Sequence, residues 1–396
     1  MNFPFLKQNK KVRIVLTGGG SGGHTFPLIA VSREIKKISE AKNIPIEIIY
    51  IGPDDFVVPY VLKEGIMVKK ILTGKFRRSF SLENFFDFFR VIAGIIQTFF
   101  YLFTIMPDLI FSKGGYGSLP IMVWGIIFFI PAYIHESDAV PGLVNHFFGR
   151  FCKKIFISFE YSKRFFPSKK TILTGNPVRE NLLNYKIDKL SVKKSLGLSE
   201  ERTLITFIGG SQGASNINDL VLDILPKIID KAEIIHQTGE KNYQLVVNEA
   251  DIVFREIIGS EEGKKYYHPF AFLGEEEALN IFSLRNVYLI SDLIVARAGS
   301  GLIFEIALSG KPAILIPLPW ATRDHQRINA YEYAKNGAAI VVEEKNLSPN
   351  IFNDLLNRVI NDKEKLDSMS KAALNFALPN ATKEIADNLM QSFFVN

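Results

Sequence analysis

Short apolar runs alternate with amphipathic stretches along the first half of the chain. The runs at residues 12–17 (VRIVLT) and 46–52 (IEIIYIG) predict strands, and a helical pattern is expected from Pro27, because proline suits the first turn of a helix. Further strands are expected at residues 108–115, 131–136 and 154–158. Strands that alternate with helices predict a parallel, doubly wound α/β sheet.

The same pattern restarts in the second half. Residues 203–215 (TLITFIGGSQGAS) again predict a strand, a glycine loop and a helix start. Further strands are expected at residues 233–239, 292–299 and 312–319. The 396 residues therefore predict two Rossmann-like domains facing a cleft. The first domain is expected at residues 1–176, with a final helix at 379–396 packing back on it, and the second domain at residues 177–378. A hinge between them is expected at 174–181 (TGNPVREN).

Two apolar stretches raise the question of a membrane span. Val91–Met106 and Leu119–Ile134 have 16 residues each, whereas a spanning helix needs roughly 20. We expect both to be helices with one face on a sheet and the other partly exposed. The segment before them, Ser81–Arg90, pairs phenylalanines with charges and predicts a helix that lies on a bilayer. The side chains expected to face the membrane are Lys75, Arg77, Arg78, Phe85, Phe86 and Phe89.

Charge and phenylalanine content are uneven along the chain. Residues 1–178 hold 23 Lys and Arg against 12 Asp and Glu, whereas the remainder holds 24 Lys and Arg against 29 Asp and Glu. Residues 1–178 also hold 23 of the 33 phenylalanines. A basic, Phe-rich half favours an anionic membrane surface as partner. Nucleic acid is less favoured, because the chain has no zinc-ligand cluster, RNP motif or homeodomain-like pattern. The alternative is that the basic residues only keep an apolar domain soluble.

The cysteine count and the N-terminus bear on location. Cys152 is the one cysteine, so no disulfide can form within the chain, which suits a reducing cytoplasm. The first 16 residues hold no uninterrupted apolar region before the first strand, so no secretory signal is expected. Together with the basic half, this predicts a peripheral protein on the cytoplasmic face of the cell membrane.

The first glycine loop, residues 18–24, resembles a dinucleotide-binding motif, which by itself is a weak signal. It contains GxGxxG at Gly18, Gly20 and Gly23, but the acidic residue of a dinucleotide site is expected about 20 positions later, and Asp54 follows Gly23 by 31. Dense glycines let the backbone approach a bulky anion closely, so a diphosphate-bearing substrate is expected. An ordinary strand-to-helix turn is the alternative.

Five more polar or glycine clusters follow expected strands. The loop 209–213 places Ser211 and backbone N–H groups at a helix start, where a second diphosphate could bind. Because the carboxyl ends of parallel strands converge on the ligand crevice, the clusters are expected to build one site. The others lie at residues 112–118, 135–138, 297–305 and 324–329.

Taken in order, these motifs resemble the MurG family, which transfers N-acetylglucosamine (GlcNAc) from UDP-GlcNAc to undecaprenyl-diphosphate-MurNAc-pentapeptide (lipid I). The resemblance covers nearly the whole chain and implies a GT-B fold and an inverting transfer. Its motifs are GGGSGGHTFP (18–27), GKFRR (74–78), SKGGYGS (112–118), HESDAVPGLVN (135–145), TGNPVR (174–179), GGSQGAS (209–215), HQTG (236–239), ARAGSGLIFEI (296–306) and DHQRINA (324–330).

The resemblance also implies roles for single residues. Glu305 is expected to bind the ribose hydroxyls of UDP, and His24 to act at the acceptor side, as base or as a positioning group, with Glu136 and Asp138 as rival bases. The remaining donor contacts are expected at Ser21, Gly22, Gly23, Asp138, Arg179, Ser211, Ser300, His325 and Gln326. Contacts to the acceptor diphosphate are expected at Gly20, Gly115, Tyr116 and Asn145.

Two departures and several alternatives qualify these expectations. Where the family has His-Glu-Gln-Asn, this chain has Ser137 and Asp138 in place of Gln and Asn, so an amide donor to the sugar is lost. The second departure is His325, where many members have Gln. Without a DxD motif, no metal or cofactor is expected. Expected partners are UDP-GlcNAc, lipid I, the anionic inner leaflet and other cell-wall synthesis proteins. The rival functions are a diacylglycerol glycosyltransferase, a GT-B-fold UDP-GlcNAc 2-epimerase and a membrane-surface scaffold.

Overall fold

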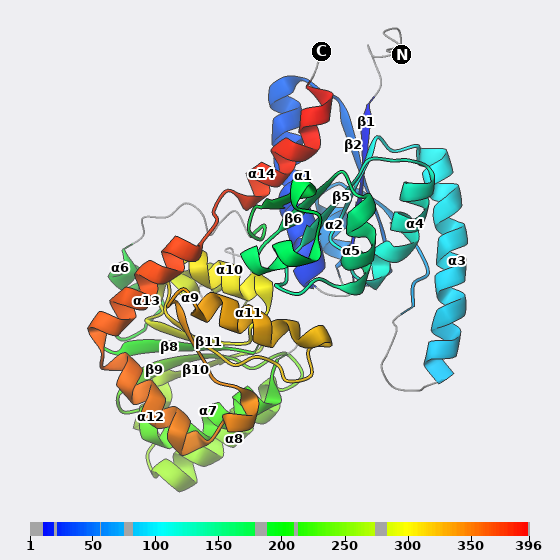
Figure 1. Ribbon diagram of the computed structural model, residues 1–396. Helices are drawn as coiled ribbons and strands as arrows, with labels where there is room; N and C mark the ends of the chain where they lie inside the picture. Colours follow the sequence, from blue (N-terminus) through cyan, green and yellow to red (C-terminus); the bar gives the residue numbers. More distant parts are fainter. Residues whose placement is uncertain are drawn as a thin grey trace. The chain divides into compact units, whose positions relative to one another are not determined.

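The computed structural model describes residues 11–19, 22–55, 57–74, 82–178, 188–209, 213–273 and 283–394, with the backbone alone for 22–24 and 82–84. The chain forms two compact units. Unit 1 comprises Met1–Arg179 and Leu378–Asn396, and unit 2 comprises Glu180–Ala377. Figure 1 labels most of their helices and several of their strands.

Unit 1 contains a seven-stranded parallel sheet in the order β3-β2-β1-β4-β5-β6-β7. Its strands are β1 (Val12–Thr17), β2 (Ile46–Gly52), β3 (Met67–Lys70), β4 (Leu109–Ser112), β5 (Ala132–Glu136), β6 (Lys154–Ile157) and β7 (Thr171–Leu173). Its helices are α1 (Gly22–Lys42), α2 (Val58–Lys63), α3 (Leu82–Ile105), α4 (Leu119–Ile127), α5 (Leu143–Phe148) and α14 (Ala381–Met390).

Unit 2 contains a six-stranded parallel sheet in the order β10-β9-β8-β11-β12-β13. Its strands are β8 (Thr203–Ile208), β9 (Ala232–Gln237), β10 (Tyr267–Phe270), β11 (Leu293–Ala296), β12 (Ala313–Leu315) and β13 (Ala339–Val341). Its helices are α6 (Lys189–Ser195), α7 (Ser215–Ile228), α8 (Tyr243–Ile252), α9 (Leu284–Ile290), α10 (Ser300–Leu308), α11 (His325–Ala334), α12 (Pro349–Ile360) and α13 (Lys363–Phe376).

Both faces of the unit 1 sheet are covered, which explains why its strands are apolar at successive positions. Ile14 and Leu16 of β1 enter one core layer, while Val15 between them enters the other. Helix α14 at the end of the chain packs beside α1 (Figure 1), and its Ile385 and Leu389 are fully buried in the first of these layers.

Each sheet reverses its strand order beside its first strand. In unit 1, β1 lies between β2 and β4, and in unit 2, β8 lies between β9 and β11. At such a switch point the loops after the two central strands diverge to opposite faces and leave a crevice at the carboxyl ends. The glycine loops that follow β1 and β8 therefore start at the ligand-binding position of each sheet.

Helix α3 is longer than the sequence pattern predicted. Residues 82–105 form one helix, which joins the amphipathic segment Ser81–Arg90 to most of the apolar stretch Val91–Met106. Among the described residues, Phe85–Ile105 is long and apolar enough to cross a membrane by length and composition, and 17% of its most apolar window is buried. The prediction that this stretch is too short to span was therefore wrong about its length, because no helix-breaking residue separates the two segments.

Two other expected helix boundaries were wrong. Helix α1 begins at Gly22, so Pro27 lies inside it rather than in its first turn. Glycines carry no side chain, so the apolar pattern held no sign of this earlier start. Residues 119–134 are not one helix, because α4 ends at Ile127, Phe129 adopts a φ of 54°, and β5 begins at Ala132.

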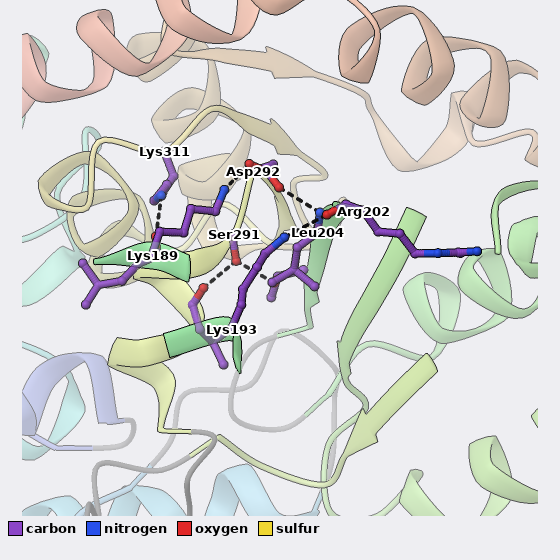
Figure 2. A network of polar contacts seen from close by, with 10 residues as sticks. Lys189, Lys193, Arg202, Leu204, Ser291, Asp292 and Lys311 are labelled. Carbon is purple, nitrogen blue, oxygen red and sulfur yellow. Dashed lines mark hydrogen bonds and ion pairs between the residues drawn. The ribbon is translucent and has the colours of Figure 1, made fainter. Parts of the chain in front are cut away.

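A polar network lies at the amino edge of the unit 2 sheet, where β8, β11 and β12 begin. Figure 2 shows Asp292 between Lys189 and the start of β8: its carboxylate pairs with the Lys189 ammonium and accepts the Leu204 N–H at 2.9 Å. Lys193 donates to the Arg202 carbonyl at 2.8 Å. These contacts join α6 to the sheet at the edge opposite the glycine loops.

Candidate functional site

The first glycine loop of unit 1 is held against the segments that follow β2 and β4. Gly19 has a φ of 137°, and a Cβ there would lie 2.7 Å from Pro53 Cγ. A Cβ on Gly117 would lie 2.7 Å from the Gly18 carbonyl oxygen, to which the Tyr50 hydroxyl also donates at 3.1 Å. Glycine is therefore required where three strand ends approach at the switch point.

Glu136 ends β5 and holds the loop that follows it. Its Oε1 accepts the Asp138 N–H at 3.0 Å, and its Oε2 accepts the Gly142 N–H at 3.1 Å and the Asn145 amide at 2.9 Å. The side chain is buried, and burial followed by the charge of Asp138 raises the pKa of this carboxyl above its usual range. The geometry makes Glu136 an anchor for the backbone of residues 138–142.

The expected acceptor contacts lie beside this loop. Gly114 and Gly115 both have positive φ, and a Cβ on Gly114 would lie 2.6 Å from Asn145 Oδ1. Asn145 is buried and donates to the His135 carbonyl at 3.2 Å as well as to Glu136. Tyr116, half-buried, follows in a 3₁₀ turn at 116–118, and burial raises its pKa. The structure thus brings Gly115, Tyr116, Glu136, Asp138 and Asn145 to one edge of one sheet.

Several expected site residues lie outside the described part of the chain. These are Gly20, Ser21, Lys75, Arg77, Arg78, Arg179 and Ser211. Gly22, Gly23 and His24 form the first turn of α1, of which the backbone is described.

In unit 2, the expected ribose ligand lies on the helix that follows β11. Helix α10 begins at Ser300, and Glu305 lies one turn further along it. The hydroxyl of buried Tyr288, on α9, donates to Glu305 Oε2 at 2.9 Å. A carboxylate has several lone pairs, so Glu305 can accept hydrogen bonds from ligand hydroxyls beside the one from Tyr288.

His325 and Gln326 begin the helix that follows β12. The preceding residues Arg323 and Asp324 have φ values of 55° and 58°, a left-handed pair that is rare outside glycine. Asp324 accepts the Arg327 Nε–H at 2.6 Å, and Gln326 Oε1 accepts the Leu318 N–H at 3.0 Å. These bonds fix a sharp turn that carries His325 and Gln326 to the same sheet edge as α10.

The second glycine loop packs against the end of β9. Gly213 has a φ of 77°, and a Cβ there would lie 2.4 Å from the Thr238 carbonyl oxygen. Buried His236 anchors that strand: its Nδ1 lies 2.9 Å from the Tyr267 hydroxyl and its Nε2 lies 3.0 Å from Asn218 Oδ1. Burial lowers the pKa of His236 to about 3, so the ring is neutral. The HQTG motif thus has a structural role beneath the loop.

Comparison with known proteins gives matches over most of the chain. Residues 14–157 match the glycosyltransferase family 28 N-terminal domain, and residues 204–388 match the family 28 C-terminal domain. A Clostridium tetani protein named UDP-N-acetylglucosamine–N-acetylmuramyl-(pentapeptide) pyrophosphoryl-undecaprenol N-acetylglucosamine transferase is 32% identical over 386 residues, which are 97% of this chain and 99% of the relative. A Bacillus anthracis protein with the same name, numbered 2, is 36% identical over 340 residues, 85% of this chain and 88% of the relative.

The chain belongs to the MurG family of glycosyltransferases.

Solved structures agree on the fold of this MurG-family chain. Acinetobacter baumannii MurG aligns with a TM-score of 0.72 at 23% identity, covering 96% of this chain and 99% of that one. The UDP-GlcNAc 2-epimerase from Neisseria meningitidis bound to UDP-GlcNAc aligns with a TM-score of 0.65 at 16% identity, covering 96% and 100%. At these identities the likeness shows the fold alone, and the expected GT-B fold with two doubly wound α/β domains is confirmed.

Two contacting residues of this MurG-family site were missed by sequence reasoning. Tyr288 lies 17 positions before Glu305 and on another helix, so no local spacing links them. Lys113 was noted only as part of a glycine cluster, yet it is buried among the ends of β4, β5 and β7. The available signal was its position, a lysine directly after the apolar strand Leu109–Ser112 and before two glycines.

Proposed function

We propose that this chain transfers GlcNAc from UDP-GlcNAc to undecaprenyl-diphosphate-MurNAc-pentapeptide, with inversion at the anomeric carbon. The observation that carries the proposal is the match to relatives named for this reaction over 97% of the chain at 32% identity. The two glycine loops at two switch points support it, because one reaction with two diphosphate-bearing substrates needs two anion-binding edges.

Unit 2 is the proposed donor unit. Glu305 accepts hydrogen bonds from the ribose hydroxyls, with Tyr288 holding its other side. Ser300, His325 and Gln326 are the proposed contacts to the donor sugar and diphosphate. Ser211, and Arg179 at the end of unit 1, are the proposed further contacts to the phosphates. The amino end of α10, a helix of nine residues, directs N–H groups that have no partner within the helix toward the departing diphosphate. Charge on the leaving UDP is thereby stabilised by the chain itself.

Unit 1 is the proposed acceptor unit. Gly20, Gly115, Tyr116 and Asn145 are the proposed contacts to the acceptor diphosphate, and Ser21, Gly22 and Gly23 of the first loop are proposed donor contacts. An inverting displacement requires a base at the acceptor hydroxyl. The proposed base is His24, because an imidazole is the side chain best suited to accept a proton near neutral pH, with Asp138 as the alternative. Glu136 fits the base role less well, because both of its oxygens already accept N–H groups of the loop.

The proposed location is the cytoplasmic face of the cell membrane, as a peripheral protein. Helix α3 packs on unit 1 through one side: Gln97 Oε1 accepts the Leu72 N–H at 2.8 Å, and Trp124 Nε1 donates to the Ile95 carbonyl at 2.8 Å. Its other side exposes more than half of Phe85, Phe86 and Phe89. A helix packed on one side and apolar on the other suits lying in the interface rather than crossing it.

A transfer assay with a panel of acceptors tests the proposed function. Purified chain is incubated in detergent with radiolabelled UDP-GlcNAc and either a lipid I analogue or diacylglycerol. We expect label to enter the organic phase with the lipid I analogue and not with diacylglycerol. Transfer to diacylglycerol alone, or release of free sugar with no transfer, would contradict the proposed acceptor. Conversion of UDP-GlcNAc without any acceptor to a 2-epimer would instead identify an epimerase.

A further inference from the structure

Lys113 occupies an unusual place for a lysine. It directly follows β4, its backbone N–H donates to the Thr17 carbonyl at the end of β1 at 2.9 Å, and 1% of the residue is exposed. Gly114 and Gly115 then turn the chain away with φ values of 76° and 80°. The side chain is thus fixed inside the carboxyl edge of the sheet, beneath the loop that ends at Gly142.

The Lys113 ammonium has an acceptor for each of its three protons. It lies 2.5 Å from His135 Nδ1 and 3.4 Å from Asn176 Oδ1, and it donates to Ser137 Oγ. These acceptors come from β5, from the loop after β5, and from the segment after β7. A buried ammonium needs such complete pairing to remain charged. One side chain therefore connects three strand ends.

The contacts of His135 define the direction of its hydrogen bond with Lys113. His135 Nε2 lies 2.9 Å from the Gly175 carbonyl, which can only accept, so Nε2 carries the proton. Nδ1 is then the acceptor and receives a proton from the lysine. Lys113 thus holds His135 as one neutral tautomer, and His135 in turn holds the segment at Gly175.

Lys113 also balances charge at this edge. Burial lowers its pKa, and the carboxylates of Glu136 and Asp138 oppose that shift. Glu136 is itself buried and bonded to the backbone of residues 138 and 142. Loss of the ammonium would leave two neighbouring carboxylates and three acceptors without their shared cation, which is costly in a buried environment.

We propose that Lys113 is a positioning residue for sugar transfer, which holds the loop at 136–142 in its working geometry and supplies the charge that allows Asp138 to stand at the sugar-facing position. Lys113 acts through Ser137, His135 and the two carboxylates, without touching substrate. The proposal rests on the proposed function, because it assigns Asp138 to that reaction.

A charge-rescue cycle tests the proposal. Lys113→Met is expected to lower kcat/KM for transfer on the order of 10- to 100-fold, since a buried charged hydrogen-bond network is broken. UDP affinity is expected to change less than about twofold, because the proposed ribose contact Glu305 and the amino end of α10 belong to unit 2. Adding Asp138→Asn to Lys113→Met is expected to raise kcat/KM at least about fivefold above that of Lys113→Met, because it removes the uncompensated charge. Asp138→Asn alone is expected to lower kcat/KM.

Lys193→Met is the matched control. Lys193, labelled in Figure 2, is like Lys113 a buried lysine, and it donates to the Arg202 carbonyl at the amino edge of the unit 2 sheet. Its variant is expected to lose thermal stability while kcat/KM stays within about twofold of wild type. If Lys113→Met does not fold, Lys113→Arg replaces it, and its charge is expected to keep activity within about tenfold.

Two results would overturn the proposal. One is wild-type kcat/KM in folded Lys113→Met. The other is an equal loss from Asp138→Asn in both backgrounds, which would mean that lysine and aspartate act independently. A failed transfer assay with intact wild-type chain would instead count against the proposed function, and Lys113→Met would then still be expected to lower thermal stability.

Discussion

The surroundings of Glu136 and Glu305 give these two glutamates different roles. Glu136 is buried, and its oxygens accept three N–H groups of the chain itself. Glu305 is half-exposed on α10 and accepts a hydroxyl from Tyr288. The first arrangement fixes a loop, whereas the second leaves acceptor capacity for a ligand.

Glu305 and Tyr288 provide a graded test of donor binding. Glu305→Ala is expected to weaken UDP affinity on the order of 10- to 100-fold, because two ribose hydroxyls lose a charged acceptor. Tyr288→Phe removes only the hydroxyl that orients the carboxylate, so a smaller loss of about three- to tenfold is expected. Isothermal titration calorimetry with UDP measures both, and Glu256→Ala, at an exposed glutamate of the same unit, serves as control. Unchanged affinity in Glu305→Ala would refute the ribose contact.

His236 predicts a pH dependence of stability in unit 2. Its folded-state pKa of about 3 lies below the unfolded value of 6.5, so the unfolded chain binds more protons between these values. The free energy of unfolding therefore falls as the pH drops below about 6.5, by up to about 1.4 kcal/mol per pH unit. Urea unfolding of wild type and His236→Gln at several pH values measures this free energy. The difference in free energy of unfolding between the two proteins should become smaller from pH 6.5 to pH 5. A difference that is constant with pH would contradict a buried neutral ring.

Sequence reasoning identified residue types near the site better than their partners. Glu305 and Glu136 stood out because they follow glycine or histidine clusters at strand ends. Tyr288 and Lys113 did not, because their partners are distant in sequence and only the fold brings them together. Long-range pairing is a property of sheet order, which the local pattern does not contain.

At the scale of elements, the strands at the centre of each sheet were predicted and several at the edges were not. The strands β1, β2, β8 and β9 have six or seven residues and apolar runs that both faces bury. The missed strands β3, β7, β10 and β13 have three or four residues and are less buried. Short edge strands need fewer apolar side chains, so their pattern is weak.

Helix α3 yields a prediction about membrane contact. Replacing Phe85, Phe86 and Phe89 together by Ser is expected to lower binding to vesicles of anionic phospholipid by at least about tenfold, because three exposed aromatic side chains no longer enter the interface. Co-sedimentation with the vesicles measures the partition. The control replaces Leu245 and Ile257, exposed apolar residues of unit 2, by Ser, and binding should stay within about twofold. Equal binding by the triple variant would rule out α3 as the contact.

At the scale of the whole molecule, the two halves of the chain have the same architecture and net charges of opposite sign. Each is a parallel sheet with a glycine loop at its switch point, and the repetition of strand, glycine loop and helix in the sequence was sufficient to predict it. The basic half, with 23 Lys and Arg against 12 Asp and Glu, also carries the exposed phenylalanines of α3. This distribution favours a division in which unit 1 meets the lipid-linked acceptor and unit 2 binds the soluble donor.

The product of the reaction tests the central claim most directly. Purified chain, UDP-GlcNAc and a water-soluble lipid I analogue are incubated, and the product is examined by mass spectrometry and by proton NMR at the new anomeric centre. We predict addition of one GlcNAc in the β configuration, inverted from the α-linked donor. An α-linked product, or GlcNAc attached to no acceptor, would contradict an inverting transfer to the lipid-linked sugar.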